Sequence, residues 1–221
     1  MTVLNGITTQ YYVALASLRG RYFLLNRDLK ALLTEARSLN TNQSAEFKTT
    51  CCSLADRLEK LARSQCEAQG LVERLVRTYQ VQMMCMMTIY YLNLVGNLYI
   101  VLIFSKNWVL TKFWFNEEVL CFTFITVYYF IDCWISLYNT FYLLDAHEEM
   151  IQLLSERTLF KSGLDKRLEA VIDTFTLNLA QNPLEIRYLG LHKNDRFSSF
   201  AVLDSFLNHI IILIQYGMEN F

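Results

Sequence analysis

The longest uncharged run in the chain is the feature that most constrains its fold. The 28 residues between Arg77 and Lys106 carry no formal charge. As a helix such a run would be about 42 Å long, whereas the hydrocarbon core of a bilayer is about 30 Å thick. Residues 78–105 are therefore predicted to form a transmembrane helix, and the chain is expected to be an integral membrane protein in contact with lipid.

Two further apolar stretches are expected to cross the membrane. Residues 119–144 are rich in Phe, Tyr, Ile and Leu and carry one formal charge, at Asp132. Residues 198–218 surround an aliphatic run from Ile210 to Ile214. With only 7 Gly and 1 Pro in 221 residues, the chain is poor in the residues that interrupt helices. The expected fold class is an all-α membrane protein with three transmembrane helices.

The segments beside these spans have the pattern of amphipathic helices. Apolar residues recur at helical spacing within residues 145–197, at Leu164, Leu168, Val171, Ile172, Phe175 and Leu179. Leucines recur in the same way within residues 1–77, at Leu54, Leu58, Leu61, Leu71 and Leu75. Residues 145–197 and the part of residues 1–77 that carries these leucines are therefore expected to form long helices outside the membrane, each with an apolar stripe that needs a partner surface.

The distribution of basic residues predicts an orientation. There are 11 Lys or Arg from Arg19 to Arg77, 2 between the first two spans and 7 from Asp145 to Phe197. Basic residues concentrate in cytoplasmic segments. Residues 106–118 are then an extracellular loop, and residues 219–221 an extracellular tail. Over the whole chain 20 basic residues balance 21 acidic ones, which gives no indication of a nucleic-acid partner.

The sequence contains no motif of an enzyme, a phosphate-binding loop or a metal site, so no catalytic residue, metal or cofactor is expected. His147 stands beside Glu148 and Glu149, just past the second span. This triplet is interpreted as a solvated helix end rather than as a metal site.

Three of the polar residues inside the first two predicted spans, Asp132, Asn93 and Asn97, are candidates for a role there. A carboxylate such as Asp132 is costly in the membrane unless it faces water, a cavity or a partner, so structural pairing and a functional lining both stay open. Asn93 and Asn97 are one helical turn apart and are expected to form hydrogen bonds across helices. A place in a ligand pocket is the functional alternative for all three.

The last span carries a polar stripe. At 100° per residue, Asp204, Asn208, Ile211 and Gln215 fall within about 60° of one another. Polar groups interrupted by one aliphatic side chain would suit a pore lined by several copies of the helix, because an apolar ring can gate by dewetting. A polar seam buried against neighbouring helices explains the same pattern.

The C-terminal run from Asn208 to Tyr216 resembles the signature of the insect gustatory receptors, usually Thr-Tyr, five apolar residues and Gln-Phe. The spacing and Gln215 match, whereas Asn208, His209 and Tyr216 replace the usual flanking residues. The preceding segment is similar to the family as well, in Gly190-Leu191, Asp195-Arg196 and Phe200.

This resemblance implies a seven-transmembrane family whose members form tetrameric, tastant-gated, non-selective cation channels in the plasma membrane of chemosensory neurons. The three spans correspond to the family's fifth to seventh helices, and residues 7–25 to the tail of the fourth. Gln215 and Tyr216 inherit a place at the gate, and the cytoplasmic helices inherit contacts between subunits. The implied partners are other gustatory receptor subunits, in a homo- or hetero-tetramer, and a small-molecule tastant.

Two hypotheses for the function follow. The first is a channel subunit, present here as a shortened form with its C-terminus outside the cell. The alternative is a membrane interaction protein that does not conduct, a receptor remnant that modulates full-length relatives.

Overall fold

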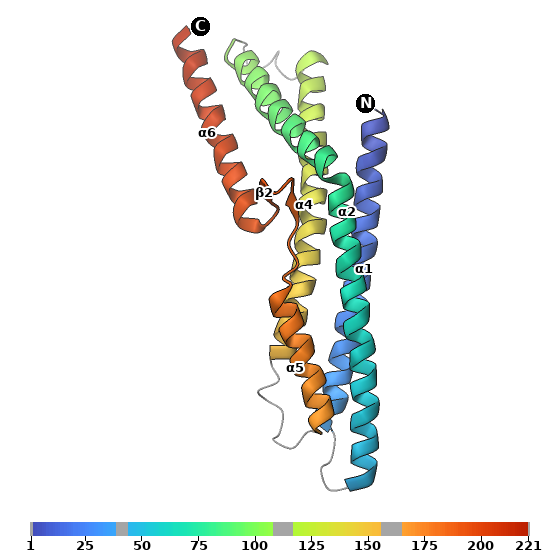
Figure 1. Cartoon of the computed structure of the whole chain (residues 1–221). Coiled ribbons are helices and arrows are strands. Elements are labelled where there is room, and N and C mark those ends of the chain that lie inside the picture. The colour runs from blue at the N-terminus through green and yellow to red at the C-terminus, as the bar shows by residue number, and fades with distance from the viewer. Residues whose placement is uncertain (1, 39–43, 108–116, 156–164, 221) are drawn as a thin grey trace. The chain divides into compact units, whose positions relative to one another are not determined.

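The computed structural model describes residues 2–38, 44–107, 117–155 and 165–220, and these residues are almost entirely helical (Figure 1). The helices are α1 (Thr2–Ser38), α2 (Ser44–Asn107), α4 (Glu117–Ser155), α5 (Lys166–Gln181) and α6 (Arg196–Asn220). Between α5 and α6, β1 (Arg187–Tyr188) and β2 (His192–Lys193) pair in antiparallel fashion. The predicted all-α fold class is confirmed.

Three described helices each contain an apolar window long enough to cross a membrane, within Phe47–Ile100, Leu120–Ser155 and Arg196–Tyr216. They contain most of the three predicted spans. In the apolar windows of α4 and α6 only 6% of the residues are buried, so these windows present apolar surface that water would not solvate well. Most of the expected loop at residues 106–118 lies outside the described residues, as do residues 156–164 of the expected cytoplasmic region.

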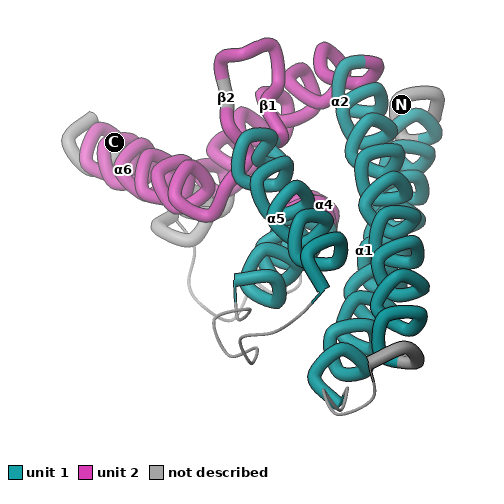
Figure 2. Tube along the Cα trace, turned by 60° about the horizontal axis from the view of Figure 1, so that its bottom comes forward, with its two compact units in different colours: residues 1–77, 139–185 teal, residues 78–138, 186–221 magenta. Residues whose placement is uncertain are grey.

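The chain divides into two compact units, coloured separately in Figure 2. The first comprises residues 1–77 and 139–185, and therefore includes α1, the first part of α2, the last part of α4, and α5. Each helix contributes fully buried side chains at helical spacing: Tyr11, Leu15, Tyr22 and Leu29 from α1, Leu54 and Leu58 from α2, Leu143, Met150 and Leu154 from α4, and Leu168, Ile172, Phe175 and Leu179 from α5. Most of the predicted amphipathic stripes thus lie in the core of this unit. An exception is Leu71, which is 39% exposed, and Leu164 lies outside the described residues.

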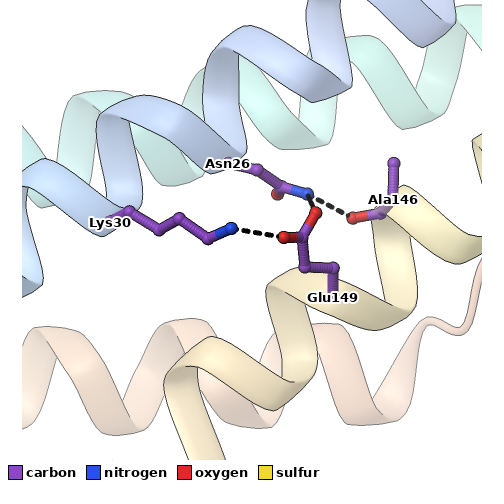
Figure 3. Close-up of polar contacts among 4 residues, drawn as sticks. All are labelled: Asn26, Lys30, Ala146 and Glu149. Carbon is purple, nitrogen blue, oxygen red and sulfur yellow. Dashed lines mark hydrogen bonds and ion pairs between the residues drawn. The ribbon is translucent and has the colours of Figure 1, made fainter.

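Polar contacts fix α1 against α4 within the first unit (Figure 3). Asn26 and Lys30 lie one turn apart on α1 and both point toward Glu149 on α4. The Asn26 side-chain amide donates to the Ala146 carbonyl at 2.7 Å and to the Glu149 carboxylate at 2.9 Å. The Lys30 ammonium lies 2.5 Å from the other Glu149 oxygen, and it lowers the pKa of this carboxyl below its ordinary value. Glu149 therefore stays ionised and holds two turns of α1.

A second set of polar contacts joins α2 to α5. The Arg167 guanidinium lies 2.5 Å from the Asp56 carboxylate near the start of α5. At the other end, the Gln69 amide donates to the Asn182 carbonyl at 3.1 Å. Since these pairs bracket the buried face of α5, they align that helix along α2.

The second unit comprises residues 78–138 and 186–221: the remainder of α2, the first part of α4, the β1–β2 hairpin and α6. Its buried cluster contains Met86, Tyr90 and Tyr129, with Leu94 and Cys133 packed against it. The Tyr90 and Tyr129 rings are 5.2 Å apart between centroids. This aromatic contact packs α2 against α4 inside the unit.

The hairpin before α6 turns through two consecutive residues in the left-handed region, Leu189 with φ 53° and Gly190 with φ 68°. The Leu191 amide closes the turn on the Tyr188 carbonyl at 3.0 Å. Glycine adopts this conformation without steric strain, which explains a Gly in the segment that resembles the family.

Candidate functional site

The polar stripe of α6 lies on exposed surface of the second unit. Asp204, Asn208, Ile211 and Gln215 are all exposed, and Ile211 retains 51% of its accessible surface. The Asn208 amide reaches the Asp204 carboxylate at 3.4 Å, one turn away along the same helix. No described part of the chain therefore buries the stripe as a seam.

The residues at the expected gate are exposed too. Tyr216 keeps 60% of its accessible surface, and Gln215 is exposed beside it. Ile210, by contrast, is 7% exposed. Hence α6 has one buried position within its aliphatic run, and the predicted pore residues lie away from that position.

Asp132, the carboxylate expected inside the second span, is paired with a tyrosine. It is half-buried on α4, where the Tyr90 hydroxyl of α2 donates a hydrogen bond to its side chain. Tyr90 is 8% exposed and is held by its ring contact with Tyr129. The structural pairing that the sequence left open thus has a named partner, because a hydroxyl donor offsets part of the cost of a carboxylate at this depth.

Among the described residues, no hydrogen bond across helices is found for the two asparagines of the first span. The Asn93 amide donates to the Ile89 carbonyl of its own helix at 2.8 Å. Asn97 is 9% exposed, and its amide nitrogen finds no acceptor among the described residues. A buried polar group without a partner costs about 1–3 kcal/mol, so the Asn97 amide nitrogen is a place where a further hydrogen-bond partner would stabilise this unit.

A second tyrosine contact, which the sequence did not predict, involves α6. The Tyr91 hydroxyl is 2.9 Å from His209 Nδ1 and 3.4 Å from the Ser205 hydroxyl. His209 Nδ1 is also 2.7 Å from the Ser205 carbonyl, which can only accept, so Nδ1 carries the hydrogen. Tyr90 and Tyr91 therefore link α2 to α4 and to α6 respectively. The sequence signal for these contacts was the pair of adjacent tyrosines inside an apolar span, because a buried tyrosine hydroxyl usually finds a hydrogen-bond partner.

The start of α6 is fixed by a cap that the sequence analysis also missed. The Asp195 carboxylate accepts a hydrogen bond from the Ser198 amide at 2.8 Å, and this bond lowers the pKa of Asp195. An Asp immediately before a helical run is a common N-cap, so the signal was present.

No group of three or more His, Cys, Asp or Glu side chains that could hold a metal ion occurs within the described ranges. The triplet expected to be a solvated helix end is different in the structure, because His147 is only 4% exposed. That interpretation was wrong for His147, whose ring lies inside the first unit.

Comparison with known proteins identifies the family. The model of the family described as 7tm Chemosensory receptor matches residues 1–220. In Drosophila melanogaster, "Putative gustatory receptor 59d" is 48% identical over 219 residues, which are 99% of this chain and 56% of that protein. "Putative gustatory receptor 36b" from the same fly is 32% identical over 222 residues, again 99% of this chain and 56% of that protein.

The chain thus spans about half the length of the curated relatives it matches. Its helices supply three candidate membrane spans, and the matching proteins are named as receptors rather than enzymes. The chain therefore belongs to the 7tm Chemosensory receptor family, which includes the insect gustatory receptors that its sequence resembles, and it is a multi-pass membrane protein.

Proposed function

We propose that this chain is the pore-forming part of a gustatory receptor subunit, a tastant-gated non-selective cation channel in the plasma membrane of chemosensory neurons. The observation that carries the proposal is the exposed polar stripe on α6. Asp204, Asn208 and Gln215 are exposed on a helix that is otherwise apolar enough to cross a membrane. Such groups are tolerated in a membrane where they face water or another subunit.

In the proposed channel several copies of α6 surround a water-filled axis. Asp204 and Asn208 give cations oxygen ligands near one end of the stripe, whereas Gln215 and Tyr216 form the gate near the other. Ile211 interrupts the stripe between them and supplies an apolar ring that closes the path by dewetting. The subunits form a homo- or hetero-tetramer with other gustatory receptors, and the C-terminus is extracellular.

The test is whole-cell current in cells that express this chain alone or with a full-length relative, with surface labelling to confirm delivery. Gln215→Ala and Ile211→Ala are expected to change conductance or resting leak. Leu213→Ala is the matched control, because Leu213 lies in the same run but off the stripe. Equal effects from all three substitutions would refute a pore lined by this face.

A small-molecule tastant is the proposed ligand, and the polar groups of the second unit are the candidates to contact it. Asp132 and Asn93 already have partners, whereas the buried amide nitrogen of Asn97 has none among the described residues. Asn97→Leu is expected to shift the concentration of tastant needed for half-maximal current. An unchanged dose–response curve with unchanged delivery would remove Asn97 from the pocket.

The alternative proposal is a membrane interaction protein that does not conduct and restrains full-length relatives. One observation favours it: the core of the first unit is built from buried side chains of four described helices. Co-purification with a full-length subunit, together with delivery to the surface and no current from the chain alone, would support this function over the channel.

A further inference from the structure

His147 is a buried titratable group that neither proposed function uses. It lies on α4 in the first unit, 4% exposed, just past the second predicted span. Its ring meets the edge of the Tyr22 ring of α1, with 6.1 Å between the centroids. The side chain is therefore enclosed by the helix bundle rather than solvated at a helix end.

The hydrogen bond of His147 fixes its protonation state. The Leu184 amide donates to His147 Nε2 at 3.4 Å, so Nε2 must present its lone pair. The single hydrogen of the neutral ring then sits on Nδ1. That nitrogen is buried and has no hydrogen-bond partner in the described part of the chain.

The donor belongs to the chain segment that leaves α5. Pro183 interrupts the helical pattern after Gln181, and Leu184 follows it at 7% exposure. The Leu184 amide is therefore the first backbone donor after the proline. Its bond to His147 attaches the connection between α5 and β1 to α4.

Few charges face this ring. Glu148 neighbours it on α4 itself, and Tyr22 faces it from α1. From α2, Cys66 and Glu73 act on Tyr22 rather than directly on the imidazole. On the connection, Glu185 is the titratable residue next to the Leu184 donor. Burial lowers the pKa of His147 below its ordinary value, and Glu148 opposes this shift only in part.

We propose that His147 is a proton-operated latch, in which protonation of Nε2 breaks the bond to Leu184 and releases the connection after α5 from α4. A protonated Nε2 is a donor, and it would face the N–H of Leu184, which is also a donor. The two groups cannot bond, and the charged ring gains water only if the connection moves away. The latch does not depend on whether the chain conducts.

The lowered pKa determines the direction of the response. In the open form, with Leu184 released, the His147 ring is solvated and titrates near its reference pKa of about 6.5. In the closed form, with Leu184 bonded to His147, the pKa is lower, so protonation is less favourable. The closed form is thus fully stable above about pH 6.5, and its stability falls as the pH drops below that value. At pH 5.5 linkage to a single site can raise the open-to-closed ratio by at most about elevenfold.

The experiment is hydrogen–deuterium exchange on the complete 221-residue chain in lipid nanodiscs at pH 7.5 and 5.5. At each pH the rate for a peptide containing Leu184 is divided by the rate for a peptide from the core of α5, residues 172–179. Because chemical exchange changes with pH for both peptides alike, the ratio isolates opening of the connection. The wild-type ratio is expected to rise several-fold, up to about tenfold, from pH 7.5 to 5.5.

His147→Gln is the decisive variant, because its amide oxygen can still accept from Leu184 but does not titrate. Its exchange ratio is expected to be the same at both pH values. His209→Gln is the matched control, since it removes an exposed histidine of α6 and should leave the wild-type rise intact. A wild-type ratio that stays flat between the two pH values would overturn the latch even if His147→Gln does not fold, and a rise that persists in His147→Gln would overturn it too.

Discussion

Replacing Tyr90 by phenylalanine isolates the hydrogen bond that the structure gives to the carboxylate inside the second span. The substitution removes the hydroxyl that donates to Asp132 and leaves the ring, with its contact to Tyr129, in place. Hydrogen bonds to charged groups contribute about 1.5–3 kcal/mol in soluble proteins. Side-chain hydrogen bonds between membrane helices stabilise the fold by about 0.6 kcal/mol on average and by about 1.7 kcal/mol at most. They contribute less because polar groups also find partners in the unfolded state within the membrane. With Tyr90 8% exposed and Asp132 half-buried, we expect a coupling energy of about 1 kcal/mol.

The assay is a double-mutant cycle with Tyr90→Phe, Asp132→Ala and the double variant, measured by unfolding in mixed detergent micelles. Tyr128→Phe is the matched control, since it removes the same hydroxyl from a nearby tyrosine that is 55% exposed. The control is expected to change stability by less than about 0.5 kcal/mol. Additive effects of Tyr90→Phe and Asp132→Ala would refute the pairing, because groups that do not interact have no coupling energy.

Three further predictions concern the first unit and the start of α6. Phe175→Ala, at a position 2% exposed, should destabilise the chain by about 3–5 kcal/mol, whereas Leu177→Ala, 57% exposed, should have almost no effect on chemical denaturation. Glu149→Gln should lose the contact with Lys30, worth about 0.5 kcal/mol after solvent screening. Because the pKa of Glu149 is lowered, the wild-type advantage in a denaturation series should be present above its ordinary pKa of 4.5 and vanish as the pH falls below it. Asp195→Ala should speed amide exchange at Ser198 while exchange at the centre of α6 stays unchanged.

The features that sequence could predict are those set by local composition. Residues 78–105 are uncharged over more than a membrane thickness, so their assignment to a span needed no tertiary information. The stripe from Leu164 to Leu179 was predicted from local composition too, and the structure buries four of its members, Leu168, Ile172, Phe175 and Leu179. The helical period determines which residues share a face, and this does not depend on which element packs against that face.

The features that sequence could not predict depend on which helices become neighbours. The pattern around His147 suits a solvated helix end as well as a buried one, and only the arrival of Tyr22 and Leu184 from distant segments buries the ring. The spacing of Asn93 and Asn97 gave the helical face but not the acceptor, and Asn93 bonds within its own helix. The hydrogen-bond partners of polar side chains in long helices depend on tertiary packing, whereas the positions of the helices along the chain depend on local sequence.

The exposed stripe on α6 and the paired carboxylate on α4 show two different ways to place polar groups in apolar helices. Asp132 has one hydrogen-bond donor inside the chain, the Tyr90 hydroxyl. The partner of Asp204 is Asn208, one turn away on the same exposed face, which leaves both side chains directed outward. A carboxylate at the centre of a membrane helix costs about 2.5–3.5 kcal/mol on insertion scales, and less near the ends, where it can reach water. We therefore expect the stripe to face water or neighbouring subunits, which is the reason to look for its function in an assembly rather than in a single chain.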